Sequence, residues 1–305
     1  MELMIAVVIM SIISLAVTTM YINTSQNYGK DERIARMQEN GRFALNMMAH
    51  DIVMADFWGE VLDPGGIIST GFNTDATQCN ASILDMETAL LYYNDNAGTP
   101  MFDPTTCAIL TTGSTTFNSD SNAFLIKRVA NEPASALEKD VVYVRSDGNT
   151  HKLYADDPPV TEAGFEDWAY QPKLYYIRDD AAGVPSLCRA VVSTGATVGF
   201  QQVADGECLA EGIEQLHIEF GLDTDGDLVP NQYKSDITTA EAETAVAIRI
   251  YLLARTADAD TTYTNDKTYT LGDLAIPAAN DNFYRRVYTT TVVLRNPKAY
   301  IALSQ

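Results

Sequence analysis

An uncharged apolar run near the start of the chain limits its possible folds more than any other feature. Residues 3–22 read LMIAVVIMSIISLAVTTMYI and contain no charged side chain. A transmembrane helix needs about 20 predominantly apolar residues, so this run is long enough to cross a bilayer. No basic segment stands before it and no small-residue cleavage motif follows it. We therefore expect the run to be retained rather than removed as a signal peptide.

The apolar run continues directly into an amphipathic segment without proline, so we expect one helix over residues 1–58. Its apolar part is 1–22 and its amphipathic part 23–58, and it would be about 80 Å long at 1.5 Å per residue. A stripe of apolar side chains in the second part predicts a core-facing surface. The stripe consists of Ile34, Met37, Ala44, Met47, Met48, Ile52 and Met54. Gly41 costs about 1 kcal/mol in a helix, so we expect a bend or the close approach of another backbone there. Gly59 is the expected C-terminal cap.

The composition is strongly acidic. Forty-one acidic and twenty basic side chains give a formal net charge of −21. A surface of this sign repels phosphate backbones, so we expect no nucleic-acid partner. Solubility is a sufficient reason for most of the excess acid.

Four cysteines, Cys79, Cys107, Cys188 and Cys208, lie outside the predicted helix and lack the spacing of a metal site. A chain exported past the membrane would oxidise them. Three connectivities are possible, and we favour the nearest neighbours, Cys79 with Cys107 and Cys188 with Cys208. Each bridge would stabilise the fold by about 3 kcal/mol in the chain-entropy description.

The remaining sequence divides into two regions. Residues 59–135 are rich in Thr, Ser, Asn, Gly and Asp, and we expect a loop-rich, disulfide-containing insertion with short strands at 89–93 and 123–126. Residues 136–305 are expected to form an antiparallel β-sheet head, because alternating side chains predict strands with one face on a core. The expected strands are 141–145, 152–154, 174–178, 187–192, 215–220, 245–255 and 285–295. With the helix covering the sheet, the predicted fold class is α+β.

No catalytic motif is present. His50, His151 and His217 are scattered, and no serine hydrolase, zinc protease, P-loop or dinucleotide-binding pattern occurs. We therefore expect no catalytic residues and no enzyme. His217 should lie on the strand face opposite Leu216 and Ile218, as a surface histidine.

One acidic stretch, DTDGDLVPN at 223–231, matches the spacing of calcium loops. Oxygen donors recur at positions 1, 3, 5, 7 and 9, from Asp223, Asp225, Asp227, the backbone carbonyl of Val229, and Asn231. Position 6 is Leu228 instead of glycine and position 12 is Lys234 instead of an acid, so a complete EF-hand is excluded. We expect one weak Ca²⁺ site here; the alternative is an acidic turn without metal.

Several segments resemble a known family. The sequence ELMIAVV at 2–8 is similar to the N-terminus of type IV pilins. The segment RMQENGRFAL at 36–45 resembles the helix of PilW-like minor pilins, and YRRVYTTTVVLRN at 284–296 resembles their closing strand. Residues 212–233, which include DTDGD, are similar as well.

The resemblance implies a pilin-like fold, with a long N-terminal helix packed on an antiparallel head. It implies a structural subunit of a type IV pilus or related filament, assembled through the apolar helix and supporting pilus assembly, adhesion or motility. It also implies that Glu2 serves assembly, because the matching glutamate of pilins neutralises a neighbour's N-terminal amine. Expected partners are other pilin subunits, the same or different. The expected location is the inner membrane as a precursor and then the extracellular filament on the bacterial surface.

Two other functions stay open at this point. A pseudopilin of type II secretion has the same tail and often binds calcium. A membrane-anchored periplasmic binding module would use the helix only as an anchor. A simple anchor needs neither Glu2 at the head of an uncharged helix nor a long amphipathic continuation beyond the membrane.

Overall fold

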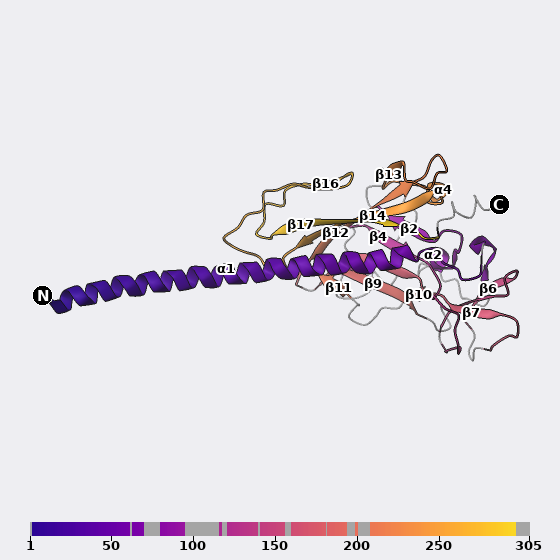
Figure 1. Ribbon diagram of the computed structural model, residues 1–305, viewed down its shortest axis with the longest axis horizontal. Coiled ribbons are helices and arrows are strands. Elements are labelled where there is room, and N and C mark those ends of the chain that lie inside the picture. Colours follow the sequence, from indigo (N-terminus) through magenta and orange to yellow (C-terminus); the bar gives the residue numbers. More distant parts are fainter. Residues whose placement is uncertain are drawn as a thin grey trace.

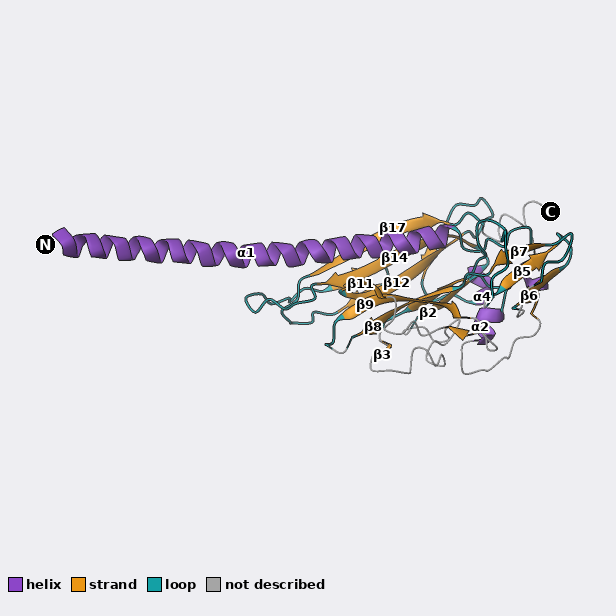
Figure 2. Ribbon diagram, turned by 90° about the horizontal axis from the view of Figure 1, so that it is seen from below, coloured by secondary structure: helices purple, strands orange, loops and turns teal. Residues whose placement is uncertain are grey.

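The computed structural model describes residues 2–61, 63–69, 80–94, 116–117, 121–139, 141–155, 160–180, 182–193, 199–200 and 208–296. A single long helix, α1 (Glu2–Val53), packs its C-terminal half against a head made mainly of β-strands (Figure 1). Its N-terminal half projects from the head, as both Figure 1 and Figure 2 show. We call the fully exposed part of this half, residues 2–28, the rod. This is the expected α+β, pilin-like fold.

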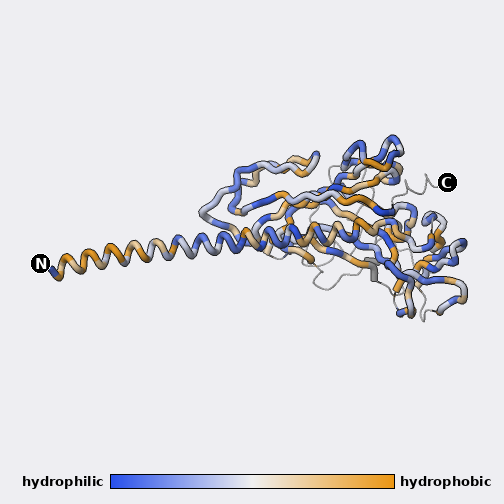
Figure 3. Tube along the Cα trace, viewed as in Figure 1, coloured by the Kyte–Doolittle hydropathy of each residue, from blue (hydrophilic) through white to orange (hydrophobic). Residues whose placement is uncertain are grey.

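Three hydroxyl groups in the apolar half of α1 are satisfied within the helix. The hydroxyls of Ser11, Thr18 and Thr19 donate to the carbonyls of Val8, Ser14 and Leu15, each at 2.8 Å. Bonds of this kind remove the cost of placing a hydroxyl in apolar surroundings. Figure 3 shows how hydropathy changes along α1, from hydrophobic in the rod to mixed where the head begins.

The helix ends at Val53, earlier than the sequence predicts. The N–H groups of Met54 and Ala55 bond three residues back instead of four, at 3.2 and 3.0 Å. Asp56 then takes a left-handed conformation with φ of 61°, and its N–H bonds the carbonyl of Lys127. The prediction that Gly59 caps the helix is therefore wrong. Gly59 has φ of +68°, but it lies beyond the end of the helix, where an added Cβ would sit 2.6 Å from Trp168.

The first sheet is formed by four strands from the C-terminal third of the chain. Its order is β13-β12-β14-β17, and all neighbours are antiparallel. The strands are β12 (Ile213–Leu222), β13 (Gln232–Lys234), β14 (Ala245–Arg255) and β17 (Arg285–Val293). The short helix α4 (Thr239–Ala242) starts with a capping box between Thr238 and Glu241.

The second sheet lies beside the first, with order β10-β9-β8-β4-β2; β11 also pairs with β9, and β3 with β8. Its strands are β2 (Leu90–Tyr93), β3 (Thr116–Phe117), β4 (Ala123–Ile126), β8 (Lys173–Asp179), β9 (Pro185–Ser193), β10 (Gly199–Phe200) and β11 (Cys208–Glu211). It takes strands from both sides of residue 135, so β2 and β4 of the expected insertion share a sheet with the strands that follow it.

Smaller elements complete the head. A third sheet has the order β1-β6-β5-β7, from β1 (Ile68–Ser69), β5 (Tyr143–Ser146), β6 (His151–Tyr154) and β7 (Glu166–Ala169). A hairpin is formed by β15 (Tyr269–Leu271) and β16 (Leu274–Ile276). The short helices are η1 (Pro64–Gly66) and α2 (Asn80–Leu84).

The main core lies between α1 and the first two sheets, where the helix was expected to cover the strands. Met37, Ala44, Met48 and Ile52 of α1 belong to one buried cluster with inward side chains of β12, β14 and β17. The buried face of α1 differs slightly from the predicted apolar stripe. Met47 and Met54 of the stripe are only half-buried, whereas Leu45 and Asp51, which are not in the stripe, are buried. A second cluster joins the second and third sheets around Trp58 and Trp168.

The helix α1 lies close to the first sheet at Gly41. An added Cβ at Gly41 would lie 2.6 Å from the ring of Tyr288 on β17. The sequence predicted either a bend or the approach of a backbone, and the structure shows the approach of an aromatic side chain instead. Beside it, Asn40 donates to the carbonyl of Glu211 at 2.9 Å, which joins the helix to β11.

Gly41→Ala is expected to lower the free energy of unfolding by about 1–3 kcal/mol, because the new methyl group overpacks against Tyr288. Gly29→Ala is the matched control, since nothing lies within 4 Å of a Cβ there. It should leave stability unchanged or raise it by up to about 1 kcal/mol through helix propensity. Denaturant unfolding of both full-length variants in detergent measures this. Equal free energies of unfolding for wild type and Gly41→Ala would show that the ring of Tyr288 can move to accommodate the added methyl group.

Candidate functional site

The apolar half of α1 is the largest exposed hydrophobic surface that the structure describes. Every residue from 2 to 28 is exposed, and Leu3, Met4 and Leu15 are 79%, 75% and 70% accessible. This helix is long and apolar enough to cross a membrane, and none of its most apolar window is buried. Burying one such side chain is worth about 1.5–3 kcal/mol. The rod therefore requires an apolar environment outside this chain.

Glu2 begins α1 and is exposed at the far end of the rod. A carboxylate at this position is favoured by the partial positive charge of the helix N-terminus. No part of the head lies near it, as Figure 1 shows. The described part of the head therefore supplies no partner for this charge.

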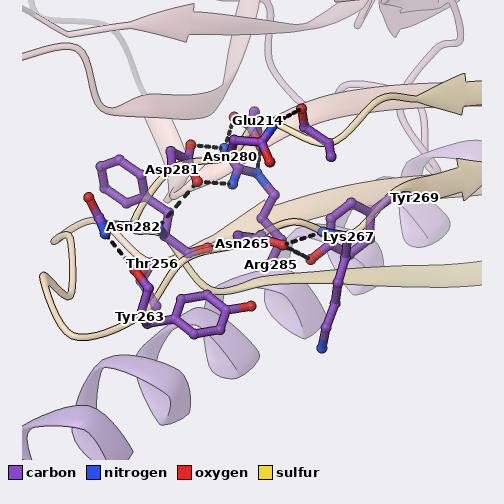
Figure 4. Close-up of polar contacts among 12 residues, drawn as sticks. Glu214, Thr256, Tyr263, Asn265, Lys267, Tyr269, Asn280, Asp281, Asn282 and Arg285 are labelled. Carbon is purple, nitrogen blue, oxygen red and sulfur yellow. Dashed lines mark hydrogen bonds and ion pairs between the residues drawn. The ribbon is translucent and has the colours of Figure 1, made fainter.

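The long connection between β14 and β17, residues 256–284, forms an ordered arm beside α1 (Figure 4). Its anchor is Arg285, whose side chain is 4% exposed. The guanidinium donates to Glu214 at 2.6 and 2.9 Å and to Asp281 at 2.6 and 2.7 Å. Burial opposes the charge of Arg285, but the two carboxylates raise its pKa well above the ordinary value. Arg285 in turn lowers the pKa of Asp281.

A fully buried amide fixes the middle of the arm. Asn265 donates to the hydroxyl of Tyr269 and to the carbonyl of Phe283, both at 3.0 Å. Its backbone bridges to Asp281. The ring of Tyr263 stacks on Tyr284 with centroids 4.0 Å apart. These contacts make the arm a rigid part of the head.

The arm meets α1 where the rod leaves the head. Arg33 lies 3.7 Å from Asp260, and the ammonium of Lys30 lies 5.1 Å from the centre of the Tyr284 ring. Hydrogen bonds from Thr262 are the largest cause of a lowered pKa at Asp260. These contacts attach the arm to α1 at the point where the rod leaves the head.

A buried polar cluster forms around His217 on β12. The prediction that His217 is a surface residue is wrong, since it is only 2% exposed. The strand alternation was identified correctly, but the second sheet covers this side: the Tyr92 hydroxyl of β2 accepts from the N–H of Ile218 at 3.1 Å. The ring Nδ1 of His217 lies 3.3 Å from the Tyr92 hydroxyl and 3.2 Å from the amide nitrogen of Asn122.

These contacts determine which nitrogen of His217 carries the proton. Two donors face Nδ1, so Nδ1 accepts, and Nε2 carries the proton and donates to Asp273 at 2.7 Å. Asp273 also accepts from Ser235 at 2.7 Å, and its N–H bonds Glu219 at 3.2 Å. His217, Glu219 and Asp273 each have one possible metal-ligand atom, and these three atoms lie within 4.8 Å of one another. The three residues are, however, already linked by direct hydrogen bonds through Asp273. The cluster attaches the β15–β16 hairpin to the first sheet.

Burial lowers the pKa of His217, and the charges of Asp273 and Glu219 offset this only in part. Between the lowered pKa and the unfolded value of 6.5, the unfolded chain binds more protons than the folded chain. His217 therefore makes the protein less stable as the pH falls below 6.5.

Unfolding at pH 7.5 and pH 5.5 tests this titration in the full chain. Wild type should lose more stability between the two pH values than His217→Gln, which retains a donor for Asp273 but cannot titrate. The difference between the two losses isolates this residue from the many carboxylates that also titrate. Equal losses in both proteins would contradict the assignment.

The DTDGD segment forms a compact loop after β12. Carboxylate oxygens of Asp223, Asp225 and Asp227 all lie within 4.8 Å of one another. Asp223 is buried and accepts from the N–H groups of Asp225, Gly226 and Leu228 at 3.2, 2.7 and 2.8 Å. Burial acts to raise the pKa of Asp223, but these donors outweigh it and the pKa is lowered. The Asp223 carboxylate is thus favoured in its ionised form.

The other two expected ligand residues, Asn231 and Val229, take part in hydrogen bonds within the loop. The side-chain oxygen of Asn231 accepts from the N–H and hydroxyl of Thr224 at 2.8 and 3.1 Å. Val229 contributes its N–H to Asp227 at 2.8 Å. Asp223, Asp225 and Asp227 are therefore the residues that could hold a metal, and Ca²⁺ binding by this loop is proposed.

Millimolar Ca²⁺ is expected to raise the melting temperature of the full chain in detergent relative to chelator. Three carboxylates without the twelfth-position acid predict a Kd of about 10⁻⁴–10⁻³ M. At 100 times Kd, binding would stabilise the fold by about 2.7 kcal/mol. Asp225→Asn should abolish the shift, whereas Asp266→Asn, an exposed arm residue, should retain it. The same melting temperature in both buffers would mean that the loop is only an acidic turn.

Sequence reasoning missed Asp51, a buried acid on the inner face of α1. It accepts from Lys173 at 2.5 Å and from the Tyr175 hydroxyl, and it lies 3.8 Å from Arg128. Burial lowers the pKa of Lys173, and Asp51 opposes this. The available signal was an acid beside Ile52 in the apolar stripe. Asp51 joins the end of α1 to the second sheet.

The expected Cys188–Cys208 disulfide is present. Its two residues face each other in the register of β9 and β11. Cys79 and Cys107 lie outside the described residues, so their pairing stays a prediction.

Comparison with known proteins adds one finding. No curated protein and no solved structure matches the chain. Residues 174–296 match the family model of PilW, the type IV pilus-assembly protein W. The matched range begins in β8 and includes the first sheet, the DTDGD loop and the arm. This match supports a PilW-like, type IV pilus-related family for the part of the chain that it covers.

Proposed function

We propose that the chain is a structural pilin subunit, held in the inner membrane by the rod and then assembled into an extracellular filament on the bacterial surface. In the filament the rods of neighbouring subunits, the same or different, cover one another and the heads form the outside. Such a filament would support pilus assembly, adhesion or motility.

The observation that carries this proposal is the division of α1 into two surfaces. Residues 37–52 bury an inward face in the head, while residues 2–28 are exposed along their whole length. A lipid bilayer can cover this rod, and so can the rods of other subunits, because both are apolar. The carboxylate of Glu2 favours the second environment as the final one, because an unpaired charge in an apolar core is costly.

Glu2→Gln is expected to leave the protein in the inner membrane at wild-type level but to deplete it from sheared filaments by at least about tenfold. This corresponds to about 1.4 kcal/mol, a modest part of the cost of breaking a buried ion pair. Glu39→Gln is the matched control, because Glu39 is exposed on the part of α1 beside the head. Quantitative immunoblotting of membrane and filament fractions gives both readouts.

The same fractionation, together with an assay of protein secretion, separates the competing functions. Wild-type protein found only in membranes, under conditions where filaments form, would favour an anchored binding module. Dependence of protein secretion on the chain, without its presence in surface filaments, would favour a pseudopilin. Normal incorporation of Glu2→Gln would contradict the role of Glu2.

A further inference from the structure

A polar groove lies between α1 and the arm, beside the last residues of the rod. Its volume is about 410 Å³, within the range of about 300–1,000 Å³ that is typical of ligand pockets. It is lined by Gln26, Asn27, Lys30 and Arg33 of α1 and by Tyr284 and residues 259–263 of the arm. We call this space the root groove.

The root groove carries a local excess of positive charge. Two cations, Lys30 and Arg33, and one carboxylate, Asp260, line it, on a chain whose net charge is −21. Arg33 lies 3.7 Å from Asp260, whereas Lys30 forms no ion pair within the ranges that the structure describes. Lys30 is half-buried, and its ammonium lies over the ring of Tyr284. A half-buried ammonium attracts an anion more strongly than an exposed one, because solvent and salt screen it less.

The length of the apolar run determines how deep the root groove would lie at a membrane. Residues 3–22 span about 30 Å at 1.5 Å per residue, which matches the hydrocarbon core of a bilayer. Gln26 and Asn27 follow Ile22 by about 6–8 Å along the helix. The headgroup layer on each side of the core is about 5–8 Å thick. The root groove therefore begins at the depth of the lipid headgroups.

Other side chains of α1 fit this depth. Tyr21 and Tyr28 are 74% and 75% exposed near the end of the apolar run, and tyrosines are enriched at membrane surfaces. Lys30 lies about 12 Å beyond Ile22 along the axis, but helical side chains lean toward the N-terminus, which here is toward the membrane. Figure 1 shows the arm, in gold, reaching further along α1 toward its N-terminus than the other described parts of the head. The arm is thus the part of the head nearest to a membrane that the rod spans.

We propose that the root groove binds the phosphate of a membrane phospholipid while the rod spans the bilayer, with Lys30 as its counter-ion. This rests on the membrane stage of the proposed function. Phosphate is the anion that a bilayer presents at the depth of the groove, and the rod brings the groove to it. The contact would hold the arm on the membrane surface and would restrict rotation of the head about the rod.

Quenching of tryptophan fluorescence in phospholipid nanodiscs measures the depth of the arm. Thr261→Trp places an indole at an exposed residue that lines the root groove. Nitroxides on the lipid headgroups should quench its fluorescence more strongly than nitroxides deep in the acyl chains. Val160→Trp is the control, because Val160 is exposed between β6 and β7 at the end of the head away from the rod, and neither label should quench it. The signal of Trp58 and Trp168 is subtracted by using wild type.

Thermal unfolding in an uncharged, phosphate-free detergent measures the phosphate contact in the full chain. A short-chain phosphatidylglycerol at ten times Kd should raise the melting temperature by about 2–4 °C. Lys30→Gln should lose most of this shift. Lys267→Gln should retain it, because it removes the same charge from an exposed arm residue outside the groove. Inorganic phosphate at the same concentration should give a smaller shift, since it has no acyl chains to contact the rod.

The outcomes separate this inference from the proposed function. Ile12→Trp, in the middle of the apolar run, reports insertion through quenching by the acyl-chain nitroxides. Absence of that quenching would overturn both the membrane stage and the inference. Insertion without headgroup quenching of Thr261→Trp, or the same lipid shift in Lys30→Gln as in wild type, would overturn the inference alone. An equal shift with inorganic phosphate would overturn the assignment of the groove to a phospholipid.

Discussion

The inward face of α1 between Met37 and Ile52 is the contact on which the rest of the structure depends. It lies against β12, β14 and β17 on one side and reaches the second sheet through Asp51. Without the helix, the inner faces of both sheets would be open to water. One stretch of about four helical turns therefore holds the head together and also fixes the rod to it.

Polar clusters determine how the other parts are placed around this core. Arg285 holds the arm to β12 through Glu214, and Asp273 holds the hairpin to His217. In the third sheet Arg145 donates to Asp167 at 2.6 Å and to the Tyr154 hydroxyl at 2.9 Å. Each cluster pairs its buried charge or imidazole with several partners, as a buried polar group requires. Such clusters specify one arrangement of loops that apolar packing alone would leave open.

The sequence predicted the features that depend on local pattern. The helix, the strand at 245–255 and the Cys188–Cys208 pair follow from periodicity, alternation and proximity along the chain. It could not predict what depends on distant neighbours. His217 alternates correctly with Leu216, but only the approach of Tyr92 from another sheet buries it. Likewise Asp56, not Gly59, turns the chain after the helix because the carbonyl of Lys127 receives its N–H. The carboxylate cluster at 223–227 was visible because all its members are local.

The division of α1 also separates folding from assembly. The core of the head contains no residue from the rod, so a change in what surrounds residues 2–28 leaves that core intact. Between the two parts, Lys30 and Arg33 contact Tyr284 and Asp260 of the arm, which adds polar surface contacts to a helix whose direction already follows from its buried face. An apolar environment around the rod, whether lipid or other apolar helices, does not compete for these polar contacts.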